Sequence, residues 1–491
     1  MKKIPLTSIG GLSIHQLITG LWQVADIEKE GHLFDPEDGA NELEQYYHDG
    51  FGTFDTADHY GSAELLAGRL LARYQYEQHK PIACTKWCPV PGQMTKEVVR
   101  IGVQERLDRL GVQQLDLLQF HWWTFQHPAW LDALHELAEL HERGLIKELG
   151  VTNFDATHLH LALADGIPIR SNQVSFSLLD RRAGGSLKEV CVHHAVKILA
   201  YGTLCGGFLS KRWLGQGDPE KISDWSRMKY RRFIESSGGW NTFQSILSAV
   251  EKIAQKHRVS VANVATKWVL SQDHVAAVII GARLGESQHR HNNMELFEFE
   301  LDDEDFQSLE KNFEETTSVP GDCGDEYRTP PFLTATGDLS QHLEQVEKIF
   351  VCNPSESRDD AVKVLSGSEW EDVAGYCRAQ RIGDLIVVSG TTATAGHSRI
   401  VAKGDAAAQT TFILDKIAAA LEALGASIKD IVRTRIYLVN VEDTLAVSKA
   451  HGRVFGQIKP ANTLLQVGGL VGDYLVEIEA DALIRNNNSL N

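Results

Sequence analysis

The sequence predicts an α/β protein made of a parallel (β/α)8 barrel followed by a smaller α+β domain. Two observations predict the barrel. Eight short β-rich runs alternate with helical patterns over residues 1–318, and this length suits one closed TIM barrel better than an open sheet. A third observation predicts the division, because residues 319–345 collect Pro, Gly, Thr and Asp without periodicity, as linkers do. We therefore expect a barrel over 1–318, a linker over 319–345 and a second domain over 346–491.

The barrel strands are expected at the β-rich runs, which are HQLITGLW, GTFDTA, IACTKW, LDLLQFHW, IKELGVTN, IRSNQVSF, KILAYGT and AAVIIGAR. Between the third and fourth runs, the helical segment TKEVVRIGVQERLDRLG has Thr95 as its expected N-cap and Gly111 as its expected C-cap. Residues 209–241 form a longer insertion before the last run, expected either over the site or on the surface. Its segment WSRMKYRRF is expected to be a solvated basic helix.

In the second domain, a strand is expected at DLIVVSGTT. A helix is expected over GDAAAQTTFILDKIAAALEALGAS, with Asp405 as N-cap and Gly425 as C-cap. The strand RTRIYLV, a helix near residues 445–455 and the strand YLVEIEADALI follow. Strands and helices in this mixture are typical of an α+β fold.

Composition narrows the class of function. The 491-residue chain is 43% apolar and carries a formal net charge of -18, which disfavours sequence-independent binding of nucleic acid. No apolar run is long enough for a membrane span, and the N-terminal segment has no secretory core, so we expect a cytoplasmic protein. Seven scattered cysteines, with the close pair Cys84 and Cys88 lacking a second pair, predict free thiols and no metal site.

Four side chains stand at or just after successive expected strand ends: Asp55, Tyr60, Lys86 and His121. In a (β/α)8 barrel these ends meet at one mouth, where catalytic residues lie. A free tyrosine has a pKa of about 10 and is a poor proton donor at neutral pH, and a nearby ammonium such as that of Lys86 lowers this pKa. Asp55 would hold Lys86, while His121 would orient a substrate carbonyl that Tyr60 protonates.

The motifs FDTADHYG, CTKW and LLQFHW, followed by GVTNF, SNQVSFSLLDRR, LAYGTL and VIIGAR, resemble the aldo-keto reductase family over essentially the whole first unit. The resemblance implies that NADPH, or NADH, is the cofactor. By this analogy Asn153 and Gln173 hold the nicotinamide carboxamide, Phe176 stacks on its ring, and Arg283 after Gly281 binds a 2′-phosphate. Further cofactor contacts are implied for Gly20, Tyr201, Gln288 and Asn292.

Tryptophans also fall at or beyond the expected strand ends. Trp22, Trp87 and Trp122 are expected to line the mouth and to favour a flat or apolar carbonyl substrate. Asp58 and His59 are expected to be solvated loop residues.

The second unit resembles the RidA/YjgF family through WEDVAGYCRAQRIGDLIVVSGTT, DIVRTRIYLVNVED, KPANTLLQV and VEIEADAL. The resemblance implies a chorismate-mutase-like α+β fold, a homotrimer and a small-molecule cleft between subunits. Tyr376 and Glu477 match cleft positions, whereas Asn462 stands where the family has an arginine that grips a carboxylate. An amide cannot replace a charged bidentate fork.

The favoured interpretation is an NADPH-dependent reductase of aldehydes or ketones, with Tyr60 as proton donor, fused to a trimerising or ligand-binding domain. Its partners would be a small carbonyl substrate and further copies of the chain. Two alternatives stay open: a cofactor-binding redox sensor, and a bifunctional enzyme whose second domain hydrolyses an enamine or imine, with Glu477 positioning a water.

Overall fold

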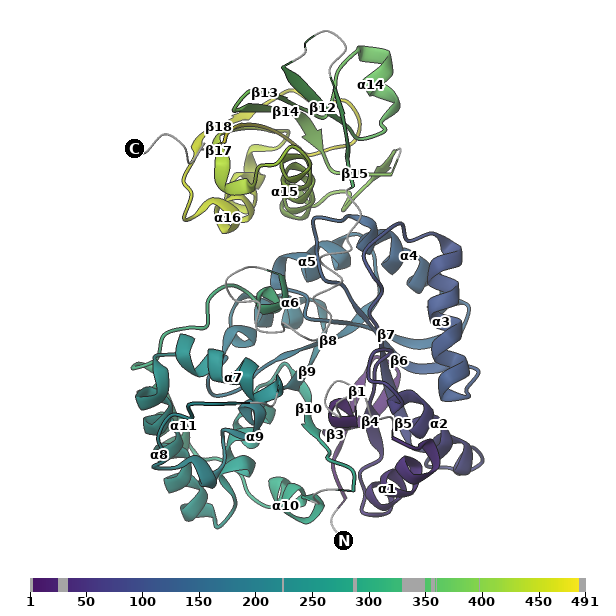
Figure 1. Ribbon diagram of the computed structural model, residues 1–491, viewed down its shortest axis with the longest axis vertical. Helices are drawn as coiled ribbons and strands as arrows, with labels where there is room; N and C mark the ends of the chain where they lie inside the picture. Colours follow the sequence, from purple (N-terminus) through teal and green to yellow (C-terminus); the bar gives the residue numbers. More distant parts are fainter. Residues whose placement is uncertain are drawn as a thin grey trace.

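The computed structural model describes residues 3–24, 34–222, 225–285, 289–328, 349–354, 358, 360–396 and 398–484. Figure 1 shows a barrel in the lower part of the view and a smaller sheet domain above it. No helix within these ranges is both long enough and apolar enough to cross a membrane.

The barrel is a closed ring of eight parallel strands in the order β10-β3-β4-β5-β6-β7-β8-β9, so the predicted fold class is confirmed. Each strand falls within one of the eight runs or begins one residue before it. The strands are β3 (Leu17–Gly20), β4 (Thr53–Asp55), β5 (Ile82–Trp87), β6 (Leu115–His121), β7 (Ile146–Thr152), β8 (Ile169–Ser175), β9 (Lys197–Tyr201) and β10 (Val275–Gly281).

Helices surround the ring: α1 (Pro36–His48), α2 (Ala63–Arg73), α3 (Lys96–Leu110), α4 (Ala129–Glu142), α5 (Ala156–Ala164), α6 (Ser186–His194), α7 (Trp225–Ser236), α8 (Gly239–His257), α9 (Val261–Leu270), α10 (Arg290–Met294) and α11 (Asp303–Phe313). The predicted caps of α3 are confirmed. The Thr95 side chain accepts from the Val98 amide at 3.3 Å, and Gly111 has a left-handed φ of 66°.

A hairpin not expected from the sequence closes the amino-terminal end of the barrel. It consists of β1 (Leu6–Ile9) and β2 (Leu12–His15), which pair antiparallel. Ile9, Leu12 and Ile14 are buried against side chains from inside the ring. The opposite, carboxyl-terminal end is therefore the end left for a ligand.

The first ten residues of the expected linker, 319–328, pack on the barrel instead. They end in α12 (Asp325–Arg328), and we call them the tail segment. Cys323 is buried, and Arg182 binds the Asp322 carbonyl at 2.7 Å and the Glu326 carboxylate at 2.9 Å. These anchors lie far apart in sequence, so local composition alone gave no sign of them.

The smaller domain holds a seven-stranded sheet in the order β11-β12-β13-β14-β19-β17-β18, with α15 packed against one face. Asp405 caps α15, as predicted, by accepting from the Ala408 amide at 2.8 Å. The elements of the smaller domain are β11 (Val351–Pro354), β12 (Ala361–Leu365), α14 (Glu369–Ala374), β13 (Ala379–Ile382), β14 (Leu385–Thr392), β15 (Thr394–Ala395), β16 (Arg399–Ile400), α15 (Ala406–Ala423), β17 (Ile431–Leu438), α16 (Thr444–Phe455), β18 (Ala461–Gln466) and β19 (Val476–Leu483).

Helix α15 of the smaller domain lies against α5 of the barrel (Figure 1). Ion pairs join the two domains there: His158–Asp415 at 2.9 Å, His160–Asp405 at 2.7 Å and Arg399–Asp165 at 2.6 Å. The contact between the domains therefore depends on paired charges.

The paired histidines predict a pH-dependent stability. Burial alone would lower the pKa of His158, but the carboxylates of Asp155 and Asp415 raise it above its usual value. A raised folded-state pKa gives stability that is complete below the unfolded value of about 6.5 and is lost as pH rises through the folded value. We expect Tm to fall more steeply between about pH 6 and pH 9 in the wild type than in His158→Gln. If Tm falls equally steeply with pH in the wild type and in His158→Gln, the predicted contribution of His158 is wrong.

Candidate functional site

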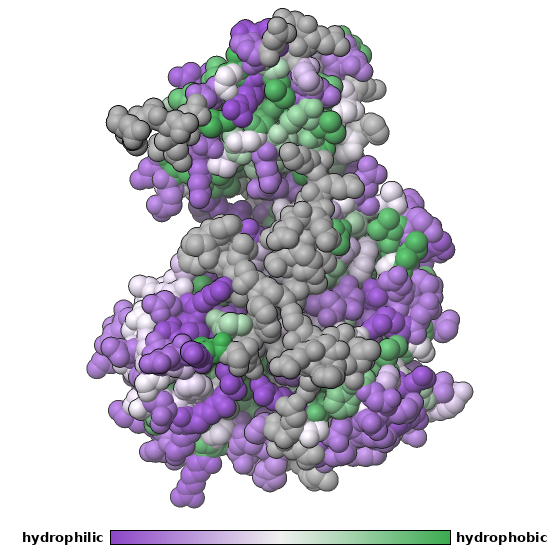
Figure 2. Space-filling view, in the orientation of Figure 1, coloured by the Kyte–Doolittle hydropathy of each residue, from purple (hydrophilic) through white to green (hydrophobic). Residues whose placement is uncertain are grey.

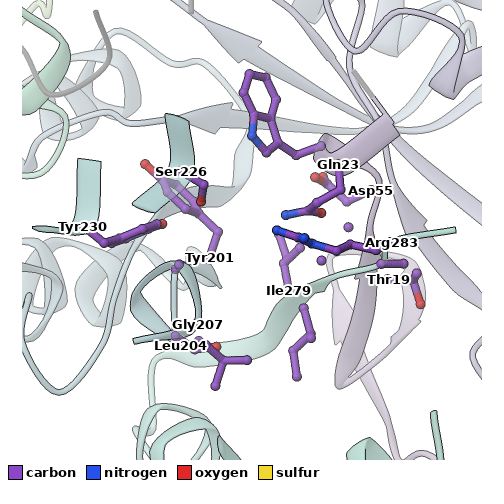
Figure 3. Close-up of a pocket in the computed structure, with 18 of the residues that line it drawn as sticks. Thr19, Gln23, Asp55, Tyr201, Leu204, Gly207, Ser226, Tyr230, Ile279 and Arg283 are labelled. Carbon is purple, nitrogen blue, oxygen red and sulfur yellow. The ribbon is translucent and has the colours of Figure 1, made fainter. Parts of the chain in front are cut away.

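A cavity of about 670 Å³ opens at the carboxyl-terminal end of the barrel strands. Figure 3 shows side chains from several elements facing it, among them Thr19, Asp55, Tyr201 and Arg283. All four residues of the predicted catalytic set line this one cavity: Asp55, Tyr60, Lys86 and His121.

Asp55 and Lys86 form a buried ion pair at the floor of the cavity. The Lys86 Nζ lies 2.6 Å from Asp55 Oδ2, and the two side chains are 2% and 4% exposed. Lys86 also donates to the Thr56 carbonyl at 2.9 Å. The amides of Gln119 and Gln173 donate to the other carboxylate oxygen of Asp55 at 3.2 and 2.8 Å. These bonds leave Lys86 in one orientation.

Tyr60 lies directly beside this pair, because a tight turn brings the chain back after β4. The Tyr60 amide donates to the Ala57 carbonyl at 3.2 Å, and Gly61 follows with a left-handed φ of 55°. The Lys86 Nζ is 4.6 Å from the centre of the Tyr60 ring. Trp22 packs edge-on against this ring at 5.1 Å. The ammonium and the phenol are thus neighbours, as the sequence predicted.

His121 ends β6 and is 5% exposed. Its ring stacks on the Trp123 ring with 5.3 Å between the ring centres, and the Asn153 side-chain nitrogen lies 3.4 Å from its Nε2. Burial, together with the nearby charges of His59, Arg328 and Lys86, holds the pKa of His121 well below its usual value. His121 is therefore a neutral imidazole at pH 7, able to donate one hydrogen bond to a carbonyl oxygen.

Polar side chains suited to an amide group line the cavity beside His121. Asn153 has a left-handed φ of 57°, and its Oδ1 accepts from the Tyr201 hydroxyl at 2.9 Å. The Asn153 backbone amide donates to the Gln173 carbonyl at 2.9 Å, just after the end of β7. Within the described part of the chain, the buried hydroxyls of Thr19 and Thr152 have no hydrogen-bond partner. These groups offer both donors and acceptors to a ligand.

The rim of the cavity is basic. Arg283 extends into it from the end of β10 (Figure 3), and Arg212, Arg227 and Lys229 reach it from the insertion. Helix α7, expected to be solvated, thus lies over the site. The basic residues of WSRMKYRRF are evident in the sequence, but their spacing does not show which face of the helix lies against the barrel.

Three predicted contact residues lie elsewhere. Trp87, Trp122 and Phe176 are buried in the core and are not among the residues that line the cavity. The reason is strand parity: side chains alternate between the two faces, so when Lys86 and His121 point inward, Trp87 and Trp122 point outward. Phe176 packs edge-on against Trp268 instead of facing a ligand.

The other predicted residues of this site are placed as follows. Gly20, Trp22, Tyr201, Gly281 and Asn292 line the cavity. Gln288 lies outside the described residues.

His59 and Tyr327 are among the cavity residues that the sequence did not predict. His59 lies edge-on to Tyr60 at 4.8 Å, and Asp58, which binds its Nδ1 at 2.7 Å, is only 14% exposed, so neither is a solvated loop residue. Tyr327 of the tail segment contacts the His121 ring at 5.9 Å, lies 3.2 Å from the Tyr201 hydroxyl and accepts a hydrogen bond from Lys229. No motif marks Tyr327, which reaches the site only through the packing of the tail segment.

In the smaller domain, Tyr376 and Glu477 lie around Gly390 of β14. The Glu477 carboxylate covers Gly390, and Arg378 donates to the Gly390 carbonyl at 2.6 Å and lies 3.5 Å from the Tyr376 hydroxyl. Burial and the neighbouring Glu479 raise the pKa of Glu477. Asn462 lies on the edge strand β18, where it accepts from Thr434 at 3.2 Å, and β17 separates it from the strand of Glu477.

Comparisons with known proteins agree with this architecture. The aldo/keto reductase family matches residues 16–313, and the endoribonuclease L-PSP family, to which RidA belongs, matches residues 367–484. The chloroplastic pyridoxal reductase of Arabidopsis thaliana is 26% identical over 297 residues, which cover 56% of this chain and 79% of the relative. A RutC family protein of Pyrococcus abyssi is 33% identical over 110 residues, or 22% of this chain and 87% of the relative.

Among solved structures, the glycerol dehydrogenase of Gluconobacter oxydans aligns with a TM-score of 0.54 at 23% identity. The alignment covers 65% of this chain and 97% of that one. At this level of identity the likeness shows that the fold is shared.

Proposed function

The chain belongs to the aldo/keto reductase family over residues 16–313, with a RidA-family domain at 367–484, and from this membership we propose that it reduces an aldehyde or ketone to the alcohol with NADPH. The observation that carries the proposal is the buried Lys86–Asp55 pair beside Tyr60, in the same cavity as a neutral His121. The basic rim and the polar groups that line the same cavity support binding of a phosphate-bearing dinucleotide.

The residues present fit such a cofactor. Asn153 and Gln173 carry the donors and acceptors that a carboxamide needs, and Arg283 carries a fork of donors suited to phosphate. Gly202 and Gly206 have left-handed φ values, and a Cβ on either would collide with the Tyr230 ring or its hydroxyl. Both positions on the cavity wall therefore require glycine. When bound, the reduced nicotinamide supplies the hydride that the carbonyl carbon accepts.

The protein's own residues then manage the proton and the position of the carbonyl. The neutral His121 donates a hydrogen bond to the carbonyl oxygen and orients it. Tyr60 gives this oxygen the proton that completes the alcohol. The ammonium of Lys86 favours the phenolate left on Tyr60, and Asp55 keeps Lys86 in place. Oxidation of an alcohol would follow the same path in reverse.

Preference for NADPH over NADH rests on Arg283. A charge-assisted bond to a phosphate contributes about 1.5–3 kcal/mol, which is about a 10- to 100-fold change in affinity. We expect Arg283→Ala to weaken NADPH binding by about this factor and to leave NADH binding nearly unchanged, as measured by fluorescence titration of both cofactors. An equal loss for both cofactors, or no loss for NADPH, would remove this part of the proposal.

For the smaller domain we propose a homotrimerising or ligand-binding role. The sheet face away from α15 exposes a set of apolar side chains, and Figure 2 shows hydrophobic residues gathered on this domain. The set is Val351, Leu365, Leu385, Val387, Leu465 and Leu483. Exposed apolar patches mark interaction surfaces, and the mass of the chain in solution tests this role. Without an arginine at position 462, hydrolysis of a carboxylate-bearing imine is the weaker candidate.

A further inference from the structure

A cluster of charged residues lies where three segments of the molecule meet. The loop after β7 and the start of α5 supply two of them, the tail segment three, and the smaller domain two. In that order they are Asp155 and His158; Asp322, Asp325 and Arg328; and Asp415 and Arg453. We call them the junction cluster.

Asp155 is the centre of the junction cluster. It is 1% exposed, and one oxygen caps α5 by accepting from the Thr157 and His158 amides at 2.9 and 3.0 Å. The other oxygen binds His158 Nδ1 at 2.6 Å and lies 3.1 Å from Arg453. The second nitrogen of His158 binds Asp415 at 2.9 Å. Two residues of the smaller domain therefore hold one buried carboxylate and its histidine.

The tail segment faces the same arginine. The carboxylates of Asp322 and Asp325 interact with Asp155 and with Arg453, and burial and the charge of Asp155 raise the pKa of both. Without Arg453, three aspartates would face one another with Arg328 and His158 as the cations of the junction cluster. The negative charges of these carboxylates repel one another, and the repulsion is strong where water is excluded.

The two barrel segments of the junction cluster, which are the loop after β7 and the tail segment, also carry residues that line the cavity. Asn153, two residues before Asp155, contacts His121 and Tyr201. Arg328 donates to the Asn153 carbonyl, and Gly324 packs so closely against this carbonyl that a Cβ there would overlap it. Tyr327, next to Arg328, lines the cavity. A shift of the loop or of the tail segment would therefore move groups that contact the ligand.

We propose that Arg453 and Asp415 of the smaller domain are positioning residues for the reductase site, because they hold the Asn153 loop and the tail segment in the arrangement that binds cofactor and substrate. The proposal rests on the proposed function of the barrel. It assigns the second domain a role in the first site that is independent of any chemistry in its own cleft.

The test uses the full-length chain and steady-state kinetics with NADPH. We expect Arg453→Met to raise KM for NADPH and to lower kcat/KM by about tenfold, a size typical of coupling between packed sites. Arg453→Lys, which keeps the positive charge, should recover most of the loss. Lys449→Met is the matched control, because Lys449 is exposed on the same helix, α16. Its kinetics should equal those of the wild type. If Arg453→Met and Lys449→Met behave alike, the proposal is wrong.

Amide hydrogen exchange gives a readout that does not need turnover. Residues 150–158 and 319–328 should exchange faster in Arg453→Met than in Lys449→Met, while β4 and β5 stay unchanged. An inactive wild type with this exchange pattern would reject the proposed function and keep the positioning role. Unchanged exchange in an active enzyme would reject the positioning role. If Arg453→Met does not fold, Asp415→Ala replaces it, with the same expected and contradicting results.

Discussion

Replacing Tyr60 with Phe should lower kcat by about 10²- to 10⁴-fold, the usual contribution of a positioned general acid. The change removes one oxygen and leaves the ring in its contacts with Trp22 and Lys86. Binding of NADPH should therefore persist, because the groups assigned to the cofactor lie on other strands. Initial rates of carbonyl reduction and a cofactor titration on the same sample separate the two effects.

The matched control is Tyr76→Phe, because Tyr76 is 93% exposed and lies outside the cavity. Its rate should equal that of the wild type. A Tyr60→Phe enzyme that keeps more than about a third of the wild-type kcat would show that another group supplies the proton.

Replacing Lys86 with Met should have the largest effect on stability and also abolish turnover. The ion pair of Lys86 with Asp55 is almost completely buried, and removal of Lys86 leaves the buried carboxylate of Asp55 without a counter-charge. The expected loss in the free energy of unfolding is about 3–5 kcal/mol, measured by chemical denaturation.

A double variant separates folding from chemistry at this pair. Lys86→Met with Asp55→Asn removes both charges, so most of the lost unfolding free energy should return. Reductase activity should stay absent, because no ammonium is left beside Tyr60. Recovery of activity together with stability would show that Lys86 serves folding alone.

The convergence of the proposed catalytic set in one cavity could be predicted because the carboxyl ends of parallel strands meet at one mouth. Asp55 and His121 occupy the last positions of their strands and Lys86 the last but one, so their convergence followed from the strand assignment. The same alternation that points Lys86 inward turns Trp87 outward, so the strand pattern itself places Trp87 and Trp122 in the core.

Other residues of the site could not be predicted from the sequence around them. Tyr327 reaches the cavity because Arg182 and a close approach at Gly324 anchor the tail segment, and both depend on residues far away in the sequence. Lys229 lies over the site because α7 folds back across it. The contact between the domains uses His158 and Arg453, which look like ordinary surface residues in the sequence until the two domains are placed together.

The most direct test of the proposed reduction is to follow deuterium from NADPH that is deuterated at both C4 positions during incubation with a panel of aldehydes and ketones, with the product alcohol analysed by mass spectrometry. We expect one deuterium on the carbinol carbon for each NADPH consumed, and loss of this product in Tyr60→Phe. Tight binding of NADPH without any deuterated alcohol would contradict this expectation and would favour a cofactor-binding sensor.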